Sequence, residues 1–265
     1  MTAPFVVATG ARTIAENMFL RVTLSNGAQG YGEAAPFPEV GGETRESCLI
    51  ARPRLGKAIL GHSAASYTNI GHVLSEQAPN DPAARCGLET AVIDAYCRAS
   101  NILMWQLWGS ADVRARETDI TIPITDLDSM AAIRRETGIP VAADESVRSL
   151  ADAQEVAARA AADYINIKIM KTGVIEAVAI ASFTKASDLK LMIGGMLETR
   201  ITMGCSFSLV LGLGGFDVLD LDTPLLLTSD PVTGGYRYEG SRLQPWSGPG
   251  LDMNAVPSLN ITTIE

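Results

Sequence analysis

In the stretch IPVAADESVRSL, residues 139–150, a short apolar run leads into two acidic residues and then into the start of a helix. An apolar run bounded by Pro140 and a polar cluster predicts a buried β-strand. Asp144 and Glu145 therefore stand at the carboxyl end of that strand. Ser149, followed three positions later by an acidic residue, predicts the start of an Ala-rich helix over 150–162.

Strand and helix patterns alternate on both sides of this stretch. The other short apolar runs are TDITIPI (118–124), DYINIKIM (163–170), LKLMIGGM (189–196) and FDVLDLDTP (216–224). The runs that begin at residues 139, 163, 189 and 216 are roughly 25 residues apart, about the length of one strand–helix unit. This spacing predicts a parallel sheet covered by helices. A barrel is favoured over an open sheet because no Gly-rich phosphate-binding loop follows the first strand.

Polar side chains stand at the carboxyl ends of two predicted strands. In 163–170 the alternating isoleucines face the helix layer, so Asn166, Lys168 and Met170 are predicted to point into the barrel. The same alternation puts Asp220 and Asp222 on one face. Barrel enzymes keep their chemistry at the carboxyl ends of the strands, and charged groups are costly to bury there without a function. These side chains are therefore candidates for an active site.

The N-terminal part of the chain has a different pattern. The segment 18–36, MFLRVTLSNGAQGYGEAAP, alternates apolar and polar residues around Asn26-Gly27, which predicts a hairpin because this dipeptide accepts positive φ in a tight turn. Helical patterns follow, and Asp81 before Pro82 predicts the start of a helix that runs to about residue 99. This part predicts a small α+β domain.

The composition indicates a globular protein with a small-molecule partner. Hydrophobic residues make up 47% of the 265 residues and charged residues 19%. The net charge of −9 disfavours nucleic acids and anionic membrane surfaces as partners. No apolar run approaches the roughly 20 residues that span a bilayer. The four cysteines are scattered, as free thiols in a reducing compartment are, so we expect a cytoplasmic protein without nucleic-acid or membrane partners.

Taken together, the motifs resemble the enolase superfamily and, within it, the dipeptide epimerases of the alanyl-glutamate type. The segments that carry the resemblance are PFVVATGARTIAEN (4–17), GYGEAAPFPEVGGET (30–44), VAADESV (141–147), INIKIMKTG (165–173), MIGGMLETRI (192–201) and DVLDLDTPLLL (217–227). The resemblance implies an α/β protein in which an enolase-type α+β capping domain, residues 1–115 completed by 226–265, sits on a modified TIM-type (β/α) barrel, residues 116–225.

The resemblance also implies a chemistry and a set of site residues. Superfamily members use a divalent metal, usually Mg²⁺, and lysine acid–base pairs to move a proton beside a carboxylate. By position, Asp144 resembles a metal ligand and Lys168 the catalytic lysine. Asp220 and Asp222 resemble the pair that holds the α-ammonium of a dipeptide, and Arg12 resembles the residue that meets an acidic substrate side chain. These residue types suit the task, since a proton beside a carboxylate is barely acidic and an ammonium binds paired carboxylates.

Each candidate also has a purely structural interpretation. Asp144 suits the N-cap of the following turn, and the aspartate pair suits a cap on the barrel rim. Arg12 suits a solvated loop, and Lys168 suits a lysine that extends its charge to the surface. Lys171 is expected to be an ordinary loop charge and is left out of the site.

The chain is short for such a barrel. Eight units need about 200–250 residues, whereas about 110 lie between Glu117 and Leu226. The resemblance implies that three units are missing after the strand at 118–124, and with them the Lys-x-Lys strand and two strands that end in metal ligands. We therefore expect an incomplete barrel.

The sequence thus predicts an isomerase, a Mg²⁺-dependent epimerase of L-Ala-L/D-Glu-like dipeptides, whose activity is impaired if the deletion is real. N-acylamino acid racemase and cycloisomerase activities are alternatives within the superfamily. A non-catalytic binding protein, assembled as a homo-oligomer through exposed strand edges, is the alternative from another class.

Overall fold

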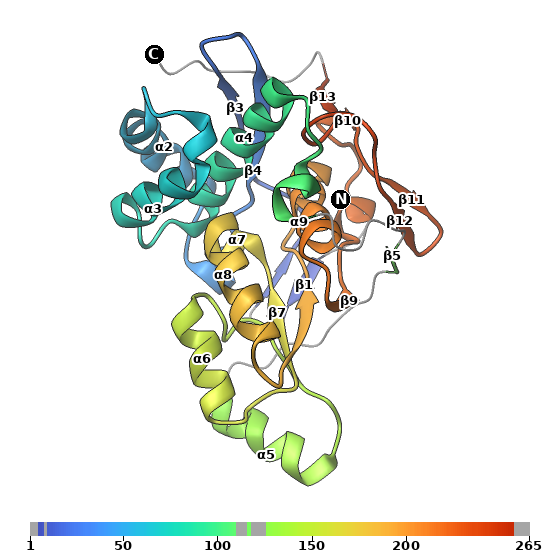
Figure 1. The fold of residues 1–265 in the computed structure, drawn as a ribbon. Coiled ribbons are helices and arrows are strands. Elements are labelled where there is room, and N and C mark those ends of the chain that lie inside the picture. The colour runs from blue at the N-terminus through green and yellow to red at the C-terminus, as the bar shows by residue number, and fades with distance from the viewer. Residues whose placement is uncertain (1–4, 8–9, 110–115, 118–125, 257–265) are drawn as a thin grey trace.

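In the computed structural model of the protein, the described residues are 5–7, 10–109, 116–117 and 126–256 (Figure 1). The strand expected at 118–124 lies outside them. The N-terminal elements are β1 (Phe5–Val7), β2 (Gly10–Arg12), β3 (Met18–Thr23), β4 (Gln29–Ala34), α1 (Pro38–Gly41), α2 (Arg45–Ile59), η1 (Ala64–Ser66), α3 (Tyr67–Gln77), α4 (Pro82–Ser100) and η2 (Met104–Trp108).

The predicted hairpin and the predicted long helix are both confirmed. Strands β3 and β4 pair antiparallel, with Met18 opposite Ala34, and Gly27 in the loop adopts a φ of 86°. Helix α4 begins at Pro82, and it ends at Ser100, before Asn101 adopts a left-handed φ of 54°. Asp81 takes the predicted N-cap position, but its side chain makes no capping hydrogen bond. In Figure 1, α2, α3 and α4 are grouped beside this hairpin.

Helix α4 packs directly on the backbone of β4. A side chain at Gly32 would overlap the carbonyl oxygen of Gly87 in α4, and one at Gly30 would overlap Ala91 and Ala95. Two strand glycines and a helix glycine therefore allow an approach that no larger residue permits. This contact buries most of α4.

The second half of the chain forms a parallel sheet at the predicted strands. The elements of this part of the chain are β5 (Arg116–Glu117), α5 (Leu127–Thr137), β6 (Ala142–Ala143), α6 (Leu150–Ala158), β7 (Tyr164–Ile167), α7 (Ile169–Thr172), α8 (Val174–Lys185), β8 (Lys190–Ile193), α9 (Arg200–Leu213) and β9 (Phe216–Leu219). Strands β6, β7, β8 and β9 are parallel neighbours in that order. Ser149 caps α6 as predicted, since its side chain accepts a bond from the Asp152 N–H.

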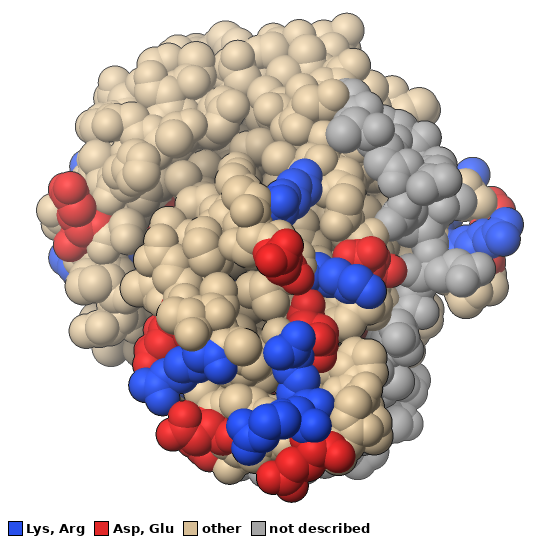
Figure 2. Space-filling model, turned by 60° about the horizontal axis from the view of Figure 1, so that its bottom comes forward, with Lys and Arg blue, Asp and Glu red and all other residues tan. Residues whose placement is uncertain are grey.

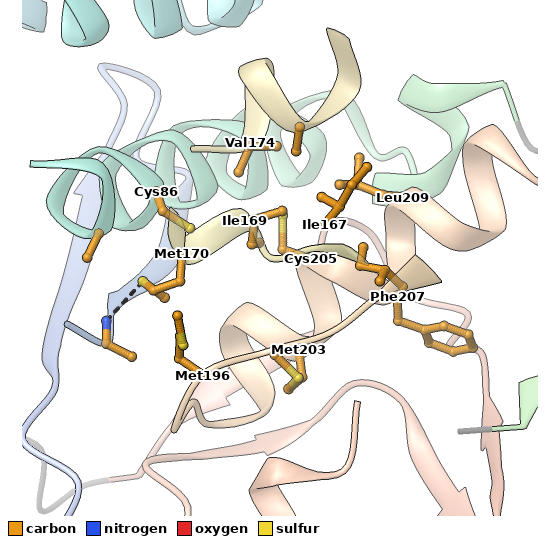
Figure 3. Packing of buried hydrophobic residues seen from close by; sticks show 14 of the residues in the cluster. Cys86, Ile167, Ile169, Met170, Val174, Met196, Met203, Cys205, Phe207 and Leu209 are labelled. Carbon is orange, nitrogen blue, oxygen red and sulfur yellow. Dashed lines mark hydrogen bonds between the residues drawn. The ribbon is translucent and has the colours of Figure 1, made fainter. Parts of the chain in front are cut away.

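Strand β7 ends earlier than the alternation pattern suggests. Strand β7 stops at Ile167, and Met170 lies in the helical turn α7 instead of pointing into a barrel. Its sulfur accepts a hydrogen bond from the Ala35 N–H at 3.2 Å, which Figure 3 shows among the buried side chains between α4, α7 and α9. The pattern cannot detect this change because isoleucine and methionine suit a buried helical turn as well as a strand.

The C-terminal segment returns to the N-terminal part. Its elements are η3 (Thr223–Leu226), β10 (Val232–Gly234), β11 (Arg237–Glu239), β12 (Arg242–Gln244) and β13 (Met253–Ala255). The buried carboxylate of Asp94 in α4 accepts bonds from the N–H groups of Tyr31, at 2.9 Å, and Leu251, at 2.7 Å. Asp94 therefore ties the hairpin and the returning segment to one helix.

The amino-terminal edge of the parallel sheet carries charges of both signs. Figure 2 shows Lys, Arg, Asp and Glu side chains interspersed on this face. A cavity of about 450 Å³ here is lined in part by Arg134, Arg159 and Asp163, but Arg134 pairs with Asp163 and Arg159 with Asp128. Among the described residues, no helix is both long and apolar enough to cross a membrane.

The close packing of α4 on β4 generates a stability prediction. We expect Gly32→Ala to lower the free energy of unfolding by about 3 kcal/mol or more, because the added methyl group overlaps backbone that cannot move aside. Gly27→Ala is the matched control, since Gly27 has no neighbour within 4 Å of an added Cβ and only its φ of 86° is strained. It should cost about 1 kcal/mol. Urea unfolding followed by circular dichroism measures both, and equal losses would contradict the packing account.

Candidate active site

The carboxyl ends of four neighbouring strands bring the candidate residues together. Asp144 follows β6, Lys168 follows β7, Gly194 follows β8 and Asp220 follows β9, each directly after the last strand residue. A Cβ at Gly194 would lie 3.1 Å from Asn166 Oδ1 and 3.3 Å from Asp220 Oδ2, so these two side chains converge above it. The parallel register thus produces one polar cluster at one edge of the sheet.

Asp144 is the centre of this cluster. Its Oδ2 lies 2.9 Å from Lys168 Nζ and accepts a bond from Asn166 Nδ2 at 3.0 Å. Its Oδ1 accepts a bond from Lys171 Nζ at 2.8 Å. The Asp144 side chain is only 3% exposed, so both oxygens exchange water for these ammonium and amide donors.

The electrostatics of the cluster reflect burial and this pairing. Burial opposes ionisation of Asp144, but the ammonium groups of Lys171 and Lys168 more than offset it and lower its pKa. Burial likewise opposes the charge on Lys168, but Asp144 outweighs it and raises the pKa of Lys168. For Lys171 burial is the larger effect, and its pKa is lowered despite the same partner.

Lys171 corrects the expectation of an ordinary loop charge. Its side chain is 2% exposed, and besides Asp144 Oδ1 its Nζ donates to the main-chain carbonyl oxygens of Asp144 and of Asn166, the latter at 3.4 Å. The signal for this placement is the spacing from Lys168 to Lys171, one helical turn, which becomes visible only once α7 is known to follow β7 directly.

Asp220 and Asp222 lie together at the end of β9. Asp222 is half-buried and stands at the start of η3, beyond the strand. Burial first, and then the Asp222 carboxylate, raise the pKa of Asp220 to about 7, and a hydrogen bond between the two side chains contributes to the rise. Two neighbouring carboxyl groups that resist joint ionisation form a site that favours a cation.

Sequence reasoning missed two buried glutamates beside this cluster. Burial raises the pKa of Glu198 to about 8, and Lys168 and Asp220 act on it electrostatically. Its Oε1 accepts a bond from the Met196 N–H, whereas its Oε2 has no hydrogen-bond partner among the described residues. Glu33 of β4 accepts bonds from the N–H and hydroxyl of Thr199. Both glutamates stand inside motifs quoted above, but only the tertiary structure places them at this edge.

Arg12 lies apart from the lysine cluster. Its guanidinium forms a bidentate pair with Glu39, with Nε 3.0 Å from Oε1 and Nη2 3.1 Å from Oε2, and it stacks 5.8 Å from the centre of the Phe37 ring. It lines a cavity of about 100 Å³ together with Asn17 and Leu197. Leu197 directly precedes Glu198 in the chain.

The described residues do not by themselves fit a Mg²⁺ site. Both Asp144 oxygens are in contact with lysine or amide donors, and no group of three His, Cys, Asp or Glu side chains in the described part converges on one point. Mg²⁺ holds its waters tightly unless several oxygen ligands compete for it. A single carboxylate engaged by two ammonium groups does not meet that requirement.

Family models match both parts of the chain. Residues 1–109 match the mandelate racemase/muconate lactonizing enzyme N-terminal domain, and residues 120–255 match the enolase C-terminal domain-like model. The chain belongs to the enolase superfamily. The expected fold class, an enolase-type capping domain with a barrel-type α/β domain, is thereby confirmed.

Enolase-superfamily relatives of this chain are named epimerases. An aromatic dipeptide epimerase of Herpetosiphon aurantiacus is 30% identical, with 92% of each chain covered. A solved mandelate racemase/muconate lactonizing protein from that organism superposes with a TM-score of 0.90 at 30% identity, covering 96% of this chain and 95% of its own. A dipeptide epimerase of Methylococcus capsulatus, solved with Mg and L-Arg-D-Lys, shares the fold with a TM-score of 0.83 at 24% identity, over 95% of each chain.

This superfamily member is shorter than its relatives. The alignment with the Herpetosiphon epimerase spans 329 positions, of which this chain supplies about 244, or 92% of its 265 residues. About 85 positions of that alignment therefore have no residue from this chain.

The buried Glu198 generates a pH prediction for this enolase-superfamily chain. Because burial raises its pKa from 4.5 to about 8, the folded state holds a proton that the unfolded state releases. The stability from this group is complete below pH 4.5 and is lost as the pH rises through about 8. Wild type should therefore lose more stability than Glu198→Gln between pH 5 and 8.5, by a few kcal/mol.

Urea midpoints at the two pH values measure this difference. Glu136→Gln is the matched control, because the Glu136 side chain is 73% exposed and its replacement should keep the wild-type pH dependence. Parallel pH profiles for wild type and Glu198→Gln would contradict the assignment of a protonated, buried carboxyl group.

Proposed function

We propose that this protein is a dipeptide epimerase by lineage, an isomerase that moves the α-proton beside a substrate carboxylate. The observation that carries this proposal is the convergence of Lys168, Asp144 and the Asp220–Asp222 pair at one edge of the parallel sheet. The names of the relatives support the same reaction class.

Each retained group has a task in this reaction. Lys168 supplies an acid–base group on one face of the α-carbon, since its Nζ stands at the strand end with Asp144 as counter-ion. Asp220 and Asp222 hold the α-ammonium of the dipeptide, because two adjacent carboxyl groups gain from a cation between them. Together they orient an amine-bearing substrate toward Lys168.

Inversion also needs groups that the described residues do not provide. One base must remove the proton and another must return it on the opposite face. We propose that the second base and the further ligands for the Mg²⁺ used by the family belong to the roughly 85 aligned positions that have no counterpart here. The 265-residue chain would then hold half of the site.

We also propose the division into domains that the sequence indicates. Residues 1–115, completed by 226–265, form the capping domain, and 116–225 form the partial barrel. The bonds of Asp94 to Tyr31 and Leu251 support the inclusion of the C-terminal segment in the first unit.

We place the protein in the cytoplasm on the chemistry of its cysteines. Cys48, Cys86, Cys97 and Cys205 are all buried free thiols. Burial raises the pKa of the Cys48 thiol to about 12 and disfavours its reactive thiolate, which suits a compartment where no disulfide is needed.

The function is tested by isotope exchange in ²H₂O. The 265-residue chain should show no deuterium incorporation at the α-carbon of L-Ala-L-Glu or of L-Ala with a neutral second residue, and no Mg²⁺ binding at millimolar concentration by calorimetry. A chain lengthened by the roughly 85 residues that the Herpetosiphon epimerase has and this chain lacks should incorporate deuterium and bind Mg²⁺.

Two results would count against this account. Exchange and tight Mg²⁺ binding by the 265-residue chain would show that the described half-site is complete without the other positions. A lengthened chain that folds and binds Mg²⁺ but exchanges no dipeptide proton would remove the epimerase assignment itself.

The aspartate pair generates a prediction on substrate orientation. In the lengthened enzyme, Asp220→Asn or Asp222→Asn should raise KM for free dipeptides roughly tenfold or more and spare N-acylated ones, because one charge-assisted hydrogen bond to the ammonium is lost. Asp217→Asn is the matched control, since Asp217 is an exposed aspartate of the same strand. Equal losses for both substrate kinds would mean that the pair only braces the rim.

A further inference from the structure

All three donors of the Lys171 ammonium group have an acceptor within the polar cluster. Its Nζ contacts Asp144 Oδ1 at 2.8 Å and the carbonyl oxygens of Asp144 and Asn166. An ammonium group has three N–H donors, and the structure supplies three acceptors for them. Those acceptors belong to the carboxyl ends of β6 and β7, so Lys171 clips two neighbouring strand ends together.

A contact with the N-terminal part of the chain restrains the turn that carries Lys171. Helix α7 ends at Gly173, which adopts a φ of 84°. The next N–H groups, of Val174 and Ile175, donate to the buried carboxylate of Glu89 in α4, at 2.5 and 3.0 Å. Since Glu89 anchors the start of α8, the turn that carries Lys171 has little freedom to move.

The two carboxylate oxygens of Asp144 have different partners. Oδ1 is held by Lys171, and Oδ2 is left to Lys168 at 2.9 Å and Asn166 at 3.0 Å. Without the Lys171 ammonium, Oδ1 would be a buried carboxylate oxygen with its main donor removed, and the group would turn or share its remaining donors. Lys168 would then lose its fixed counter-ion.

We propose that Lys171 is a positioning residue that fixes the rotamer of Asp144 and, through it, the place of Lys168. The reactive role of Lys168 rests on the proposed function, but the dependence of Lys168 on Lys171 does not. The contacts predict a hierarchy between the two lysines. Lys171 keeps two carbonyl partners when Lys168 is removed, whereas Lys168 has no carbonyl partner among the described residues to keep when Lys171 is removed.

The test is NMR of the lysine ammonium groups in the 265-residue chain, without substrate or turnover. The chain has five lysines, of which Lys57, Lys185 and Lys190 are exposed and Lys168 and Lys171 are buried. With ¹⁵N-lysine, only buried, paired ammonium groups exchange protons slowly enough to give sharp signals. Wild type should therefore show two such signals, and their absence in folded protein would overturn the proposal.

The matched variants are Lys171→Met and Lys168→Met. In folded Lys171→Met, proton exchange at Lys168 should quicken by about tenfold or more, enough to broaden its signal, because its counter-ion is no longer fixed. In Lys168→Met the Lys171 signal should persist. Lys185→Met, an exposed lysine replaced in the same way, should leave both signals unchanged.

The asymmetry separates positioning from general support of the fold. A purely structural lysine would lower the unfolding midpoint and leave Lys168 exchange unchanged in the folded variant, which would overturn the proposal. Loss of the Lys171 signal in Lys168→Met would overturn it too, since the hierarchy would be reversed or symmetric. If Lys171→Met does not fold, Lys171→Gln is judged by the same Lys168 criterion, because its uncharged amide has only two N–H donors and cannot replace the three contacts of the ammonium group.

Discussion

The buried Asp144 carboxylate is the group around which the carboxyl edge of the parallel sheet is organised. A carboxylate that is 3% exposed is stable only if cations and hydrogen-bond donors replace its water, and Lys168, Lys171 and Asn166 do so. Each donor comes from β7 or from the turn that follows it. The pairing therefore holds two neighbouring strands in register at the end where the chemistry of barrel enzymes occurs.

Buried carboxylates also join the two halves of the chain. Carboxylates from the N-terminal half accept bonds from backbone N–H groups of the C-terminal half. Glu33 receives the Thr199 N–H at the start of α9, Glu89 receives two N–H groups at the start of α8, and Asp94 receives that of Leu251. Helix starts leave free N–H groups and favour negative charge, so these acids orient the helices that carry the site.

These contacts explain how a short chain keeps a recognisable half-site. The strand ends with Asp144, Lys168, Gly194 and Asp220 are consecutive in the sheet, and polar side chains at these ends contact one another. The aligned positions without a counterpart in this chain leave that set of neighbours intact. The proposed function assigns the second base and the further oxygen ligands to those positions.

The sequence by itself determined the hairpin around Asn26-Gly27, the start of α4 at Pro82, the positions of β6 to β9 and the family, because these depend on local patterns and on motifs read in order. It also determined that Asp144, Lys168 and Asp220 stand at the carboxyl ends of strands of one parallel sheet. Only the tertiary structure decided that Lys171 is buried against Asp144, that Arg12 is engaged by Glu39, and that Glu33 and Glu198 lie beside the site. The physical reason is that burial and charge pairing depend on which segments meet across the fold, and residues such as Glu33 and Thr199, 166 positions apart, carry no mark of that contact in the sequence.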